Sequence, residues 1–360
     1  MCGAERPPVE EVSQSTLKGS QSSVSTDVCS RQILEGRVMK VGIMCKSYGQ
    51  RCGISTYSER LNRALNKAGV KSHIFINEPH EDVDIISVQY EPGILHPIVL
   101  GNFLTRHKNQ KVVVTAHHTR GLGQLFGVID GIVLHDESQI LPTEVPPKNK
   151  YRVIPHPALV FPRLDKKEVK KELGLPTDKI IIGTAGFICG TGKRLPVILS
   201  HLLELLEDDV FLYFITSFWK GGDMGRYKQI SNLVKMYGKE NQFRIDIDFK
   251  TEEELNKSMQ ACDLLFAWNI TGPNDKGSQS GIASDMYGSY TKLIVKDSPH
   301  YSFIKKQKGV LVGPTDPRAF AEAVIKAAKS ENLHDVPDPT WLSWDNQVKK
   351  YIEYFEEVIG

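Results

Sequence analysis

Short apolar runs alternate with amphipathic segments along the chain from residue 39 onward. The segment 53–69 places Leu61, Ala64 and Leu65 on one face of a helix, and Gly69 follows as its C-cap. Apolar runs typical of buried strands occupy 39–45, 70–76, 83–89, 111–116 and 131–135, with an amphipathic segment at 95–107. Strands that alternate with helices indicate a parallel sheet with crossover helices.

The same alternation starts again after a proline-rich stretch at 141–167. Beyond it, the pattern predicts strands at 180–187, 210–216, 243–249, 263–268 and 292–295, and helices at 193–207, 224–237, 252–261 and 280–288. The last segment, 346–360, spaces four apolar residues for one buried helical face and could pack on either unit. We therefore predict an α/β protein with two doubly wound, Rossmann-like domains that face a central cleft.

The length agrees with two domains, because single hydrophobic cores stop growing near ~250–300 residues and this chain has 360. We expect one domain over 39–157, a second over 158–341, and a C-terminal helix over 342–360, for which crossing back to the first domain is one of two alternatives. Residues 1–38 contain a Ser-, Thr- and Gln-rich stretch with little apolar surface. Such a composition predicts a disordered leader.

The charge balance does not indicate a nucleic-acid-binding protein. The formal net charge is +2, and residues 39–157 carry 14 Lys and Arg against 10 Asp and Glu, together with 8 of the 11 His. Proteins that bind nucleic-acid phosphates usually present a more concentrated basic face. The mild excess is compatible with an anionic small ligand.

The sequence also favours a cytoplasmic protein with at most peripheral membrane contact. It has no apolar run near the ~20 residues of a membrane span and no secretory signal pattern. No Cys-x-x-Cys pair occurs, so the spacing supports neither a zinc site nor a disulfide framework. The six cysteines are interpreted as reduced thiols: Cys2, Cys29, Cys45, Cys52, Cys189 and Cys262.

Candidate binding residues lie in the loops that follow the predicted strands, because open parallel sheets bind ligands beyond the carboxyl ends of their strands. In the first loop, 45–56, Gly49 and Gly53 would let backbone N–H groups approach a phosphate or a sugar at a helix N-terminus. The glycine spacing matches neither the dinucleotide fingerprint nor the P-loop. A plain tight turn is the alternative.

Histidines begin the loop after the strand at 111–116. His117 at a strand end could bind a substrate hydroxyl or stabilise developing charge, or could be a satisfied structural residue. A metal site built from His117, His118, His135 and Asp136 is conceivable, because neighbouring strand ends converge. No known ligand spacing supports it, and we expect no metal.

Two later loops offer groups for an anion. The glycine-rich turn at 183–195 ends in Lys193 and Arg194, and cations at a helix N-terminus are easier to explain beside a diphosphate than as a solvated pair. The long polar loop at 268–288 contains Gln279, Ser280 and Gly281 at a helix start. A mobile surface loop is the alternative for the latter.

In order and spacing, these segments resemble the two-domain, B-type-fold retaining glycosyltransferases, and are similar to glycosyltransferase family 4, over 39–330. The resemblance rests on GISTYSERLNRALNKAG, VDIISVQYEPGI, VVVTAHH, YRVIPHP, KKELGLPTDKIIIGTAGFICGTGKRLPVILSHL and TEEELNKSMQACDLLFAW. It implies an acceptor-side first domain, a nucleotide-sugar-binding second domain, and retaining transfer without a metal or other cofactor.

Carried over by position, the resemblance implies catalytic roles for His117, beside the transferred sugar, and Lys193, on the diphosphate. The donor-binding set that it implies is Gly53, Gly186, Lys193, Arg194, Gln279, Ser280, Gly281 and Asp285, and the acceptor-side candidates are Tyr48, Arg51, Glu91 and His118. The sequence departs from the family pattern in two ways. Phe187 stands where the family usually has Arg, and the family's two glutamates, eight residues apart, are replaced by Ser280-Gly281 and Asp285.

Three functions follow from this comparison. The first is transfer of a sugar from a nucleotide-diphosphate sugar to a glycan, a lipid or another hydroxyl acceptor. The second is epimerisation of the nucleotide sugar, for which Glu91 and Asp285 are the candidate carboxylates. The third is a catalytically inactive binding or scaffold protein. The sequence does not identify the sugar, the nucleotide, the acceptor or the oligomeric state.

Overall fold

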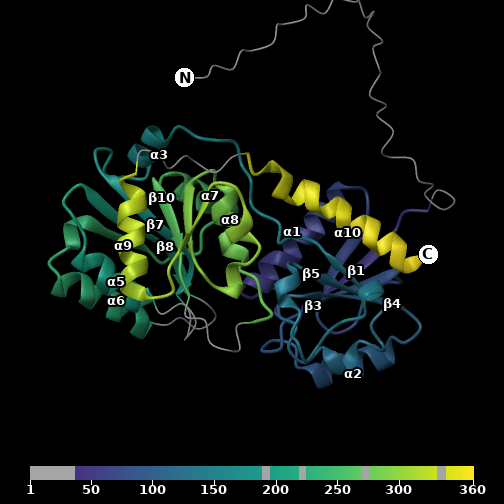
Figure 1. The fold of residues 1–360 in the computed structure, drawn as a ribbon. Coiled ribbons are helices and arrows are strands. Elements are labelled where there is room, and N and C mark those ends of the chain that lie inside the picture. The colour runs from purple at the N-terminus through teal and green to yellow at the C-terminus, as the bar shows by residue number, and fades with distance from the viewer. Residues whose placement is uncertain (1–36, 189–194, 219–223, 270–275, 331–337) are drawn as a thin grey trace, which may run out of the picture. The chain divides into compact units, whose positions relative to one another are not determined.

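The computed structural model describes residues 37–188, 195–218, 224–269, 276–330 and 338–360. Residues 38–360 form one compact unit, shown in Figure 1. The predicted disordered leader falls almost wholly on residues 1–36, outside the described part of the chain. Among the described residues, no helix is both long and apolar enough to cross a membrane.

The first half contains a six-stranded sheet in the order β2-β1-β3-β4-β5-β6, in which every neighbouring pair is parallel. Its core strands are buried on both faces, as expected where helices cover a parallel sheet. The elements are β1 (Lys40–Met44), α1 (Gly53–Lys67), β2 (Lys71–Phe75), β3 (Ile85–Tyr90), α2 (Pro97–Arg106), β4 (Lys111–Ala116), β5 (Gly131–Leu134) and β6 (Tyr151–Val153).

The second half contains another parallel sheet, in the order β12-β11-β10-β7-β8-β9. The expectation of two Rossmann-like sheets is confirmed. The elements are α3 (Lys166–Glu172), β7 (Ile180–Ile188), α5 (Leu195–Glu204), β8 (Val210–Phe218), α6 (Met224–Met236), β9 (Phe243–Asp246), α7 (Glu252–Gln260), β10 (Leu264–Ala267), α8 (Gly281–Gly288), β11 (Lys292–Lys296), β12 (Val310–Gly313) and α9 (Pro317–Ala328).

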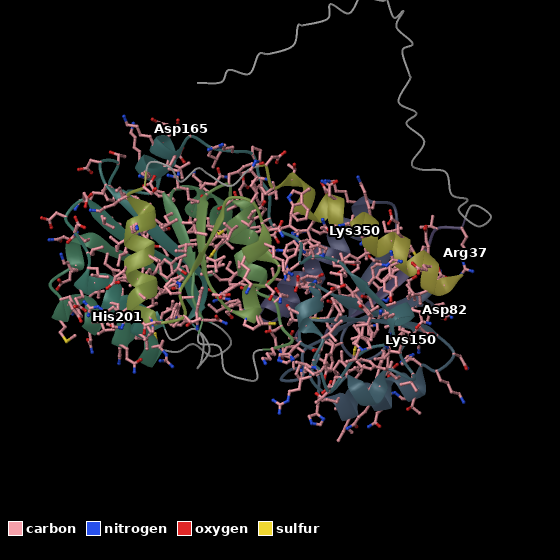
Figure 2. The ribbon with its side chains drawn as sticks, viewed as in Figure 1. Arg37, Asp82, Lys150, Asp165, His201 and Lys350 are labelled. Carbon is pink, nitrogen blue, oxygen red and sulfur yellow. The ribbon has the colours of Figure 1, made fainter. Side chains whose placement is uncertain are left out.

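The C-terminal helix α10 (Trp344–Ile359) crosses back to the first sheet, which is one of the two placements that the sequence left open. Its buried residues share a hydrophobic cluster with β1 and α1, and in Figure 1 the yellow helix lies over the strands of the first half. The Tyr354 hydroxyl accepts a hydrogen bond from the Ile132 N–H at 3.0 Å and donates one to the Lys150 carbonyl at 2.9 Å. Labelled charged residues such as Asp82, Asp165 and Lys350 lie at the periphery (Figure 2).

Three elements were not predicted: α3, β12 and α9, while β6 was expected only from the resemblance of YRVIPHP to a family strand that leads into the interdomain linker. Strand β6 has only three residues, α3 is dominated by charged residues, and β12 leaves Leu311 and Val312 exposed. Each lacks a long apolar run, whereas α9 is amphipathic and its signal was overlooked. The predicted strand at 243–249 ends earlier, at Asp246.

Candidate functional site: a cleft between two parallel sheets

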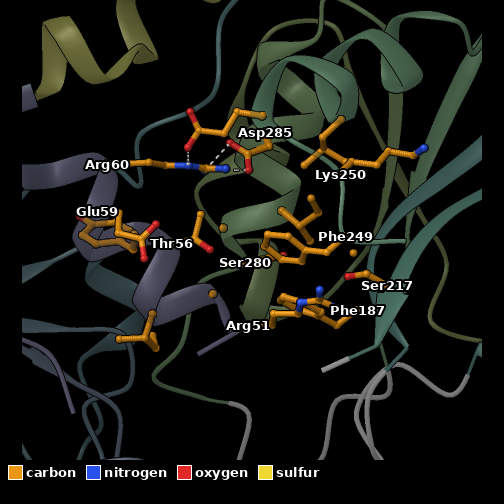
Figure 3. Close-up of a pocket in the computed structure, with 18 of the residues that line it drawn as sticks. Arg51, Thr56, Glu59, Arg60, Phe187, Ser217, Phe249, Lys250, Ser280 and Asp285 are labelled. Atoms are coloured by element: carbon orange, nitrogen blue, oxygen red, sulfur yellow. Dashed lines mark hydrogen bonds and ion pairs between the residues drawn. The ribbon is translucent and has the colours of Figure 1, made fainter. Parts of the chain in front are cut away.

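A cleft of about 1080 Å³ opens at the carboxyl ends of both sheets. Its walls come from the loops after β1, β3 and β4 in the first half, and from the ends of β7 and β8 and the segments after β9 and β10 in the second. Strand order reverses between β1 and β3, and between β7 and β10. Such reversal points are where ligands bind in open α/β sheets. Figure 3 shows the side chains that meet across this cleft.

Most of the residues singled out from the sequence line this one cleft. Tyr48 and His118 do not, although they lie in neighbouring loops. Lys193 and Arg194, the predicted diphosphate ligands, lie outside the described residues. The predicted residues that line the cleft are Arg51, Gly53, Glu91, His117, Gly186, Gln279, Ser280, Gly281 and Asp285.

Two helices, one from each half, begin at the cleft. Helix α1 starts at Gly53, after Cys52, whose sulfur accepts a hydrogen bond from the Ser55 N–H at 3.3 Å. Helix α8 starts at Gly281, after Ser280, whose hydroxyl accepts one from the Ala283 N–H at 3.3 Å. The free N–H groups and partial positive charge of a helix start favour an anion. The cleft therefore offers two helix starts to one anionic ligand.

An ion-pair cluster, formed by Arg60, Glu252 and Asp285, joins the two halves beside the cleft (Figure 3). The Arg60 guanidinium donates to both Asp285 oxygens at 3.0 and 3.2 Å and to Glu252 at 2.9 Å. Asp285 also accepts from the Leu159 N–H at 2.8 Å. Burial lowers the pKa of Arg60, but the two carboxylates outweigh it and raise the pKa. Asp285, predicted to bind the donor, therefore has its carboxylate committed to Arg60.

An imidazole cluster, formed by His117, His135 and His156, lies in the first half. Tyr57 packs against all three rings, with centroid distances of 4.6, 5.5 and 4.9 Å respectively. Burial lowers the pKa of His117 well below its usual value, that of His135 to about 3 and that of His156 to about 4. All three imidazoles are therefore neutral near pH 7. His117 and His156 line the cleft.

An aromatic pair covers part of the opposite wall. The rings of Phe187 and Phe249 stack with centroids 6.2 Å apart, and the Arg51 guanidinium lies 5.7 Å from the centroid of Phe249. Arg51 is exposed, and it is the one Lys or Arg among the described residues of the cleft wall that has no ion pair. Phe187, at the position of a family Arg, thus contributes an apolar surface.

Sequence reasoning missed Arg60, Glu252 and His156. The candidate metal set, with His117, His118, His135 and Asp136, is rearranged: His117 and His135 meet His156 instead. Asp136 accepts from the Ser138 N–H and pairs with Lys306. His156 follows the short strand β6, which only the family resemblance indicated, and it was not singled out as a site residue. Arg60 and Glu252 carried no local signal because their partners are distant in the sequence.

The comparisons with known proteins establish the fold. No family model and no curated protein matches this chain. Among solved structures, HepE from Anabaena in complex with UDP and glucose is 12% identical and matches with a TM-score of 0.66, covering 88% of this chain and 99% of that one.

Two further solved structures are similar. A glycosyltransferase from Rickettsia africae is 11% identical (TM-score 0.64; 89% of this chain, 99% of that one). Sucrose-phosphate synthase from Thermosynechococcus elongatus is 14% identical and matches with a TM-score of 0.62, covering 89% of this chain and 96% of that one. With its two parallel sheets, this chain has the B-type fold of two-domain glycosyltransferases.

Proposed function

We propose that the protein is a glycosyltransferase that moves a sugar from a nucleotide-diphosphate sugar to a hydroxyl acceptor, with retention at the anomeric carbon. The observation that carries the proposal is the meeting of two helix starts, Gly53 of α1 and Gly281 of α8, in one cleft. A diphosphate is the part of such a donor that two sets of free N–H groups would bind. The solved complex of HepE with UDP and glucose supports a UDP-sugar as the donor.

The proposed roles of the described residues follow from their position in the cleft, and those of Lys193 and Arg194 from the resemblance. The α1 and α8 starts and Lys193 would stabilise the negative charge that builds on the departing nucleoside diphosphate, and Arg194 would assist. Arg51, an acceptor-side candidate from the sequence, is reassigned to this charge because it is a cation of the described cleft wall without an ion pair. Gln279 and Ser280 would contact the donor. His117 would lie beside the transferred sugar, and its neutral ring would accept a hydrogen bond without adding charge. The transfer step as proposed uses no metal ion.

The remaining sequence-based assignments stay proposals. Gly186 would face the donor. Glu91 would lie on the acceptor side, and Tyr48 and His118 would lie on the same side, in neighbouring loops that do not line the cleft. Asp285 would serve the donor site indirectly, by fixing α8 against α1 through Arg60. A glycan or lipid acceptor and a cytoplasmic location are likewise predictions from the sequence.

The contacts of Asp285 weaken the epimerase alternative. An acid–base pair needs two carboxylates with access to the sugar, and both oxygens of Asp285 accept hydrogen bonds from Arg60. Glu91 would be left without its proposed partner. Measurement of turnover distinguishes the scaffold alternative from the transferase, because a scaffold would bind a nucleotide sugar without releasing nucleotide.

The test is incubation of the full chain with UDP-, GDP- and ADP-sugars, followed by measurement of released nucleotide and of sugar products. We expect nucleotide release from a UDP-sugar that increases with a glycan or lipid acceptor. Isomerised sugar without acceptor would indicate the epimerase, and binding without turnover the scaffold.

Two variants test the diphosphate contacts. We expect Arg51→Ala and Lys193→Ala each to reduce turnover by ~10²–10³-fold, comparable to the loss of one preorganised donor. Lys67→Ala is the matched control, because its ammonium is exposed and pairs with Asp345 away from the cleft. Wild-type turnover in either cleft variant would contradict that residue's assignment.

A further inference from the structure

Three adjacent strands of the first sheet each lead to a histidine. His117 directly follows β4, His135 directly follows β5, and His156 comes shortly after β6. These strands are neighbours in the sheet and parallel, so their carboxyl ends meet at one edge. One ring nitrogen from each histidine lies within 4.8 Å of the others. All three side chains are at least nine-tenths buried.

The hydrogen bonds fix which nitrogen of each ring carries the proton. His135 Nδ1 lies 3.0 Å from the Ile154 carbonyl oxygen, and His156 Nδ1 lies 3.0 Å from the Pro157 carbonyl oxygen. His117 Nε2 lies 3.0 Å from Oε1 of Gln89. A carbonyl or amide oxygen only accepts, so each of these nitrogens donates its N–H. The second nitrogen of each neutral ring is then an acceptor.

The acceptor of His135 has no partner among the described residues. Its Nε2 is buried and unbonded, in a side chain with 0% exposure. The neighbouring Tyr57 hydroxyl is hydrogen-bonded to that of Tyr351. Burying an acceptor without a donor costs free energy, and one ring nitrogen of each of the other two histidines lies close by. A cation or a hydrogen-bond donor between the three rings would satisfy the unbonded nitrogen of His135.

We propose that His117, His135 and His156 bind a divalent transition-metal ion of the zinc class. Neutral imidazole is a common ligand for such ions, and three imidazoles form a known zinc-binding set. Metal-bound histidines typically donate their other N–H to a carbonyl or carboxylate, which all three of these do. His117 and His156 line the cleft, so a fourth ligand would enter from that side.

This site does not depend on the proposed transfer reaction. The sequence led us to expect no metal at this sheet edge, so the site proposed here departs from that expectation. The transfer step as proposed still uses no metal, and the metal would bind whether or not transfer occurs. The two proposals compete for His117, because its free nitrogen cannot contact both a metal and a sugar. Bound zinc would therefore inhibit transfer.

The experiment uses the full chain after removal of metal with a chelator. Zn²⁺ is titrated in competition with a chromophoric chelator, and Co²⁺ is titrated while the visible absorption of tetrahedral cobalt is followed. We expect one Zn²⁺ per chain, the cobalt bands, and a rise in the thermal unfolding midpoint with Zn²⁺. Absence of stoichiometric zinc binding by the wild-type chain would overturn the proposal, whatever the fate of any variant.

His135→Asn identifies the site, because His135 is a proposed ligand that does not line the cleft. We expect its zinc affinity to fall ~100-fold or more, beyond the ~10–100-fold that loss of an outer partner costs. His80→Asn is the matched control, since His80 is an exposed histidine of the same half. Circular dichroism checks folding. A folded His135→Asn that binds zinc like the wild type would contradict the assignment.

Discussion

The imidazole cluster is buried, and so are Arg60 and Asp285 of the ion-pair cluster, whose Glu252 is half-buried. Both clusters border the same cleft, yet they differ in how fully their polar atoms are paired. In the ion-pair cluster, Arg60 reaches two carboxylates, and Asp285 also accepts from a backbone N–H. In the imidazole cluster, His135 keeps a buried nitrogen without a partner among the described residues.

This difference indicates that the ion-pair cluster has a structural role, whereas the imidazole cluster is a candidate binding site. A buried charge is tolerated where partners surround it, and removing one partner leaves the other uncompensated. The ion-pair cluster also links α1 of one half to α7 and α8 of the other. The imidazole cluster lies within one half and is neutral, so it can accept a cation without losing an existing ion pair.

The largest expected effect is a loss of stability of the metal-free protein in mild acid. The folded-state pKa values, about 3 for His135 and about 4 for His156, lie below the ~6.5 of an unfolded histidine. As the pH falls below ~6.5, the unfolded chain binds protons that the folded chain excludes, so the free energy of unfolding falls. In this range each histidine lowers the free energy of unfolding by ~1.4 kcal/mol for each pH unit of acidification, and the three together lower it by ~4 kcal/mol per pH unit.

Urea unfolding at pH 7, 6 and 5, with a chelator present, measures this dependence. His135→Asn should reduce the slope by about one third of the cluster's share. The two carboxylates of the ion-pair cluster differ from each other: burial raises the pKa of Glu252, but Arg60 and Arg63 outweigh it and lower the pKa, whereas burial outweighs Arg60 at Asp285 and raises the pKa there. Equal slopes in the wild type and His135→Asn would show that the imidazole cluster titrates normally.

Loss of Arg60 should have the next largest effect. Arg60→Ala leaves the buried Asp285 carboxylate without its cation, and breaking a buried pair in this way costs ~3–5 kcal/mol. The measurement is the free energy of unfolding from urea titration at pH 7, with nucleotide-sugar affinity as a second readout, because α8 begins at the proposed donor site.

Arg63→Ala is the matched control for Arg60. Arg63 binds the same carboxylate, Glu252, but its side chain is 63% exposed. Exposed ion pairs contribute ~0–1 kcal/mol, so the two variants should differ several-fold. If they destabilise the protein equally, the ion-pair cluster does not hold the two halves together.

The sequence predicted the fold and part of the cleft wall because both depend on local patterns. Apolar runs marked the core strands, and the loops after them supplied Gly53, His117, Gln279 and Gly281, all of which line the cleft. In a parallel sheet the carboxyl ends share one edge, so residues placed after strands converge without knowledge of side-chain contacts.

The two clusters could not be predicted in the same way. Arg60 and Asp285 are 225 residues apart, and nothing in either segment indicates that α1 and α8 pack together. The imidazole cluster was predicted in part: His117 and His135 were considered together as metal ligands, but His156 follows a strand of only three residues, which is too short to give a clear apolar pattern. Long-range pairing and short edge strands need the tertiary structure.

The smallest expected effect distinguishes the two helix starts. A Cβ at Gly281 would lie 2.6 Å from Nε2 of His156, whereas a Cβ at Gly53 would meet nothing within 4 Å. Gly281→Ala should therefore cost ~1–3 kcal/mol of unfolding free energy, as overpacking does. Gly53→Ala should change it by no more than ~0.5 kcal/mol, yet weaken binding of a UDP-sugar, because the new methyl group would stand before the α1 N–H groups.

Urea titration and donor binding, measured on both variants, separate packing from ligand contact. The double variant Gly281→Ala/His156→Ala tests the cause of the strain, because removing the imidazole makes room for the new methyl group. We expect the double variant to lose less stability than the sum of its single substitutions, since residues in contact are not additive. Additive losses would mean that His156 does not pack against the start of α8, and that the imidazole cluster is independent of the proposed donor site.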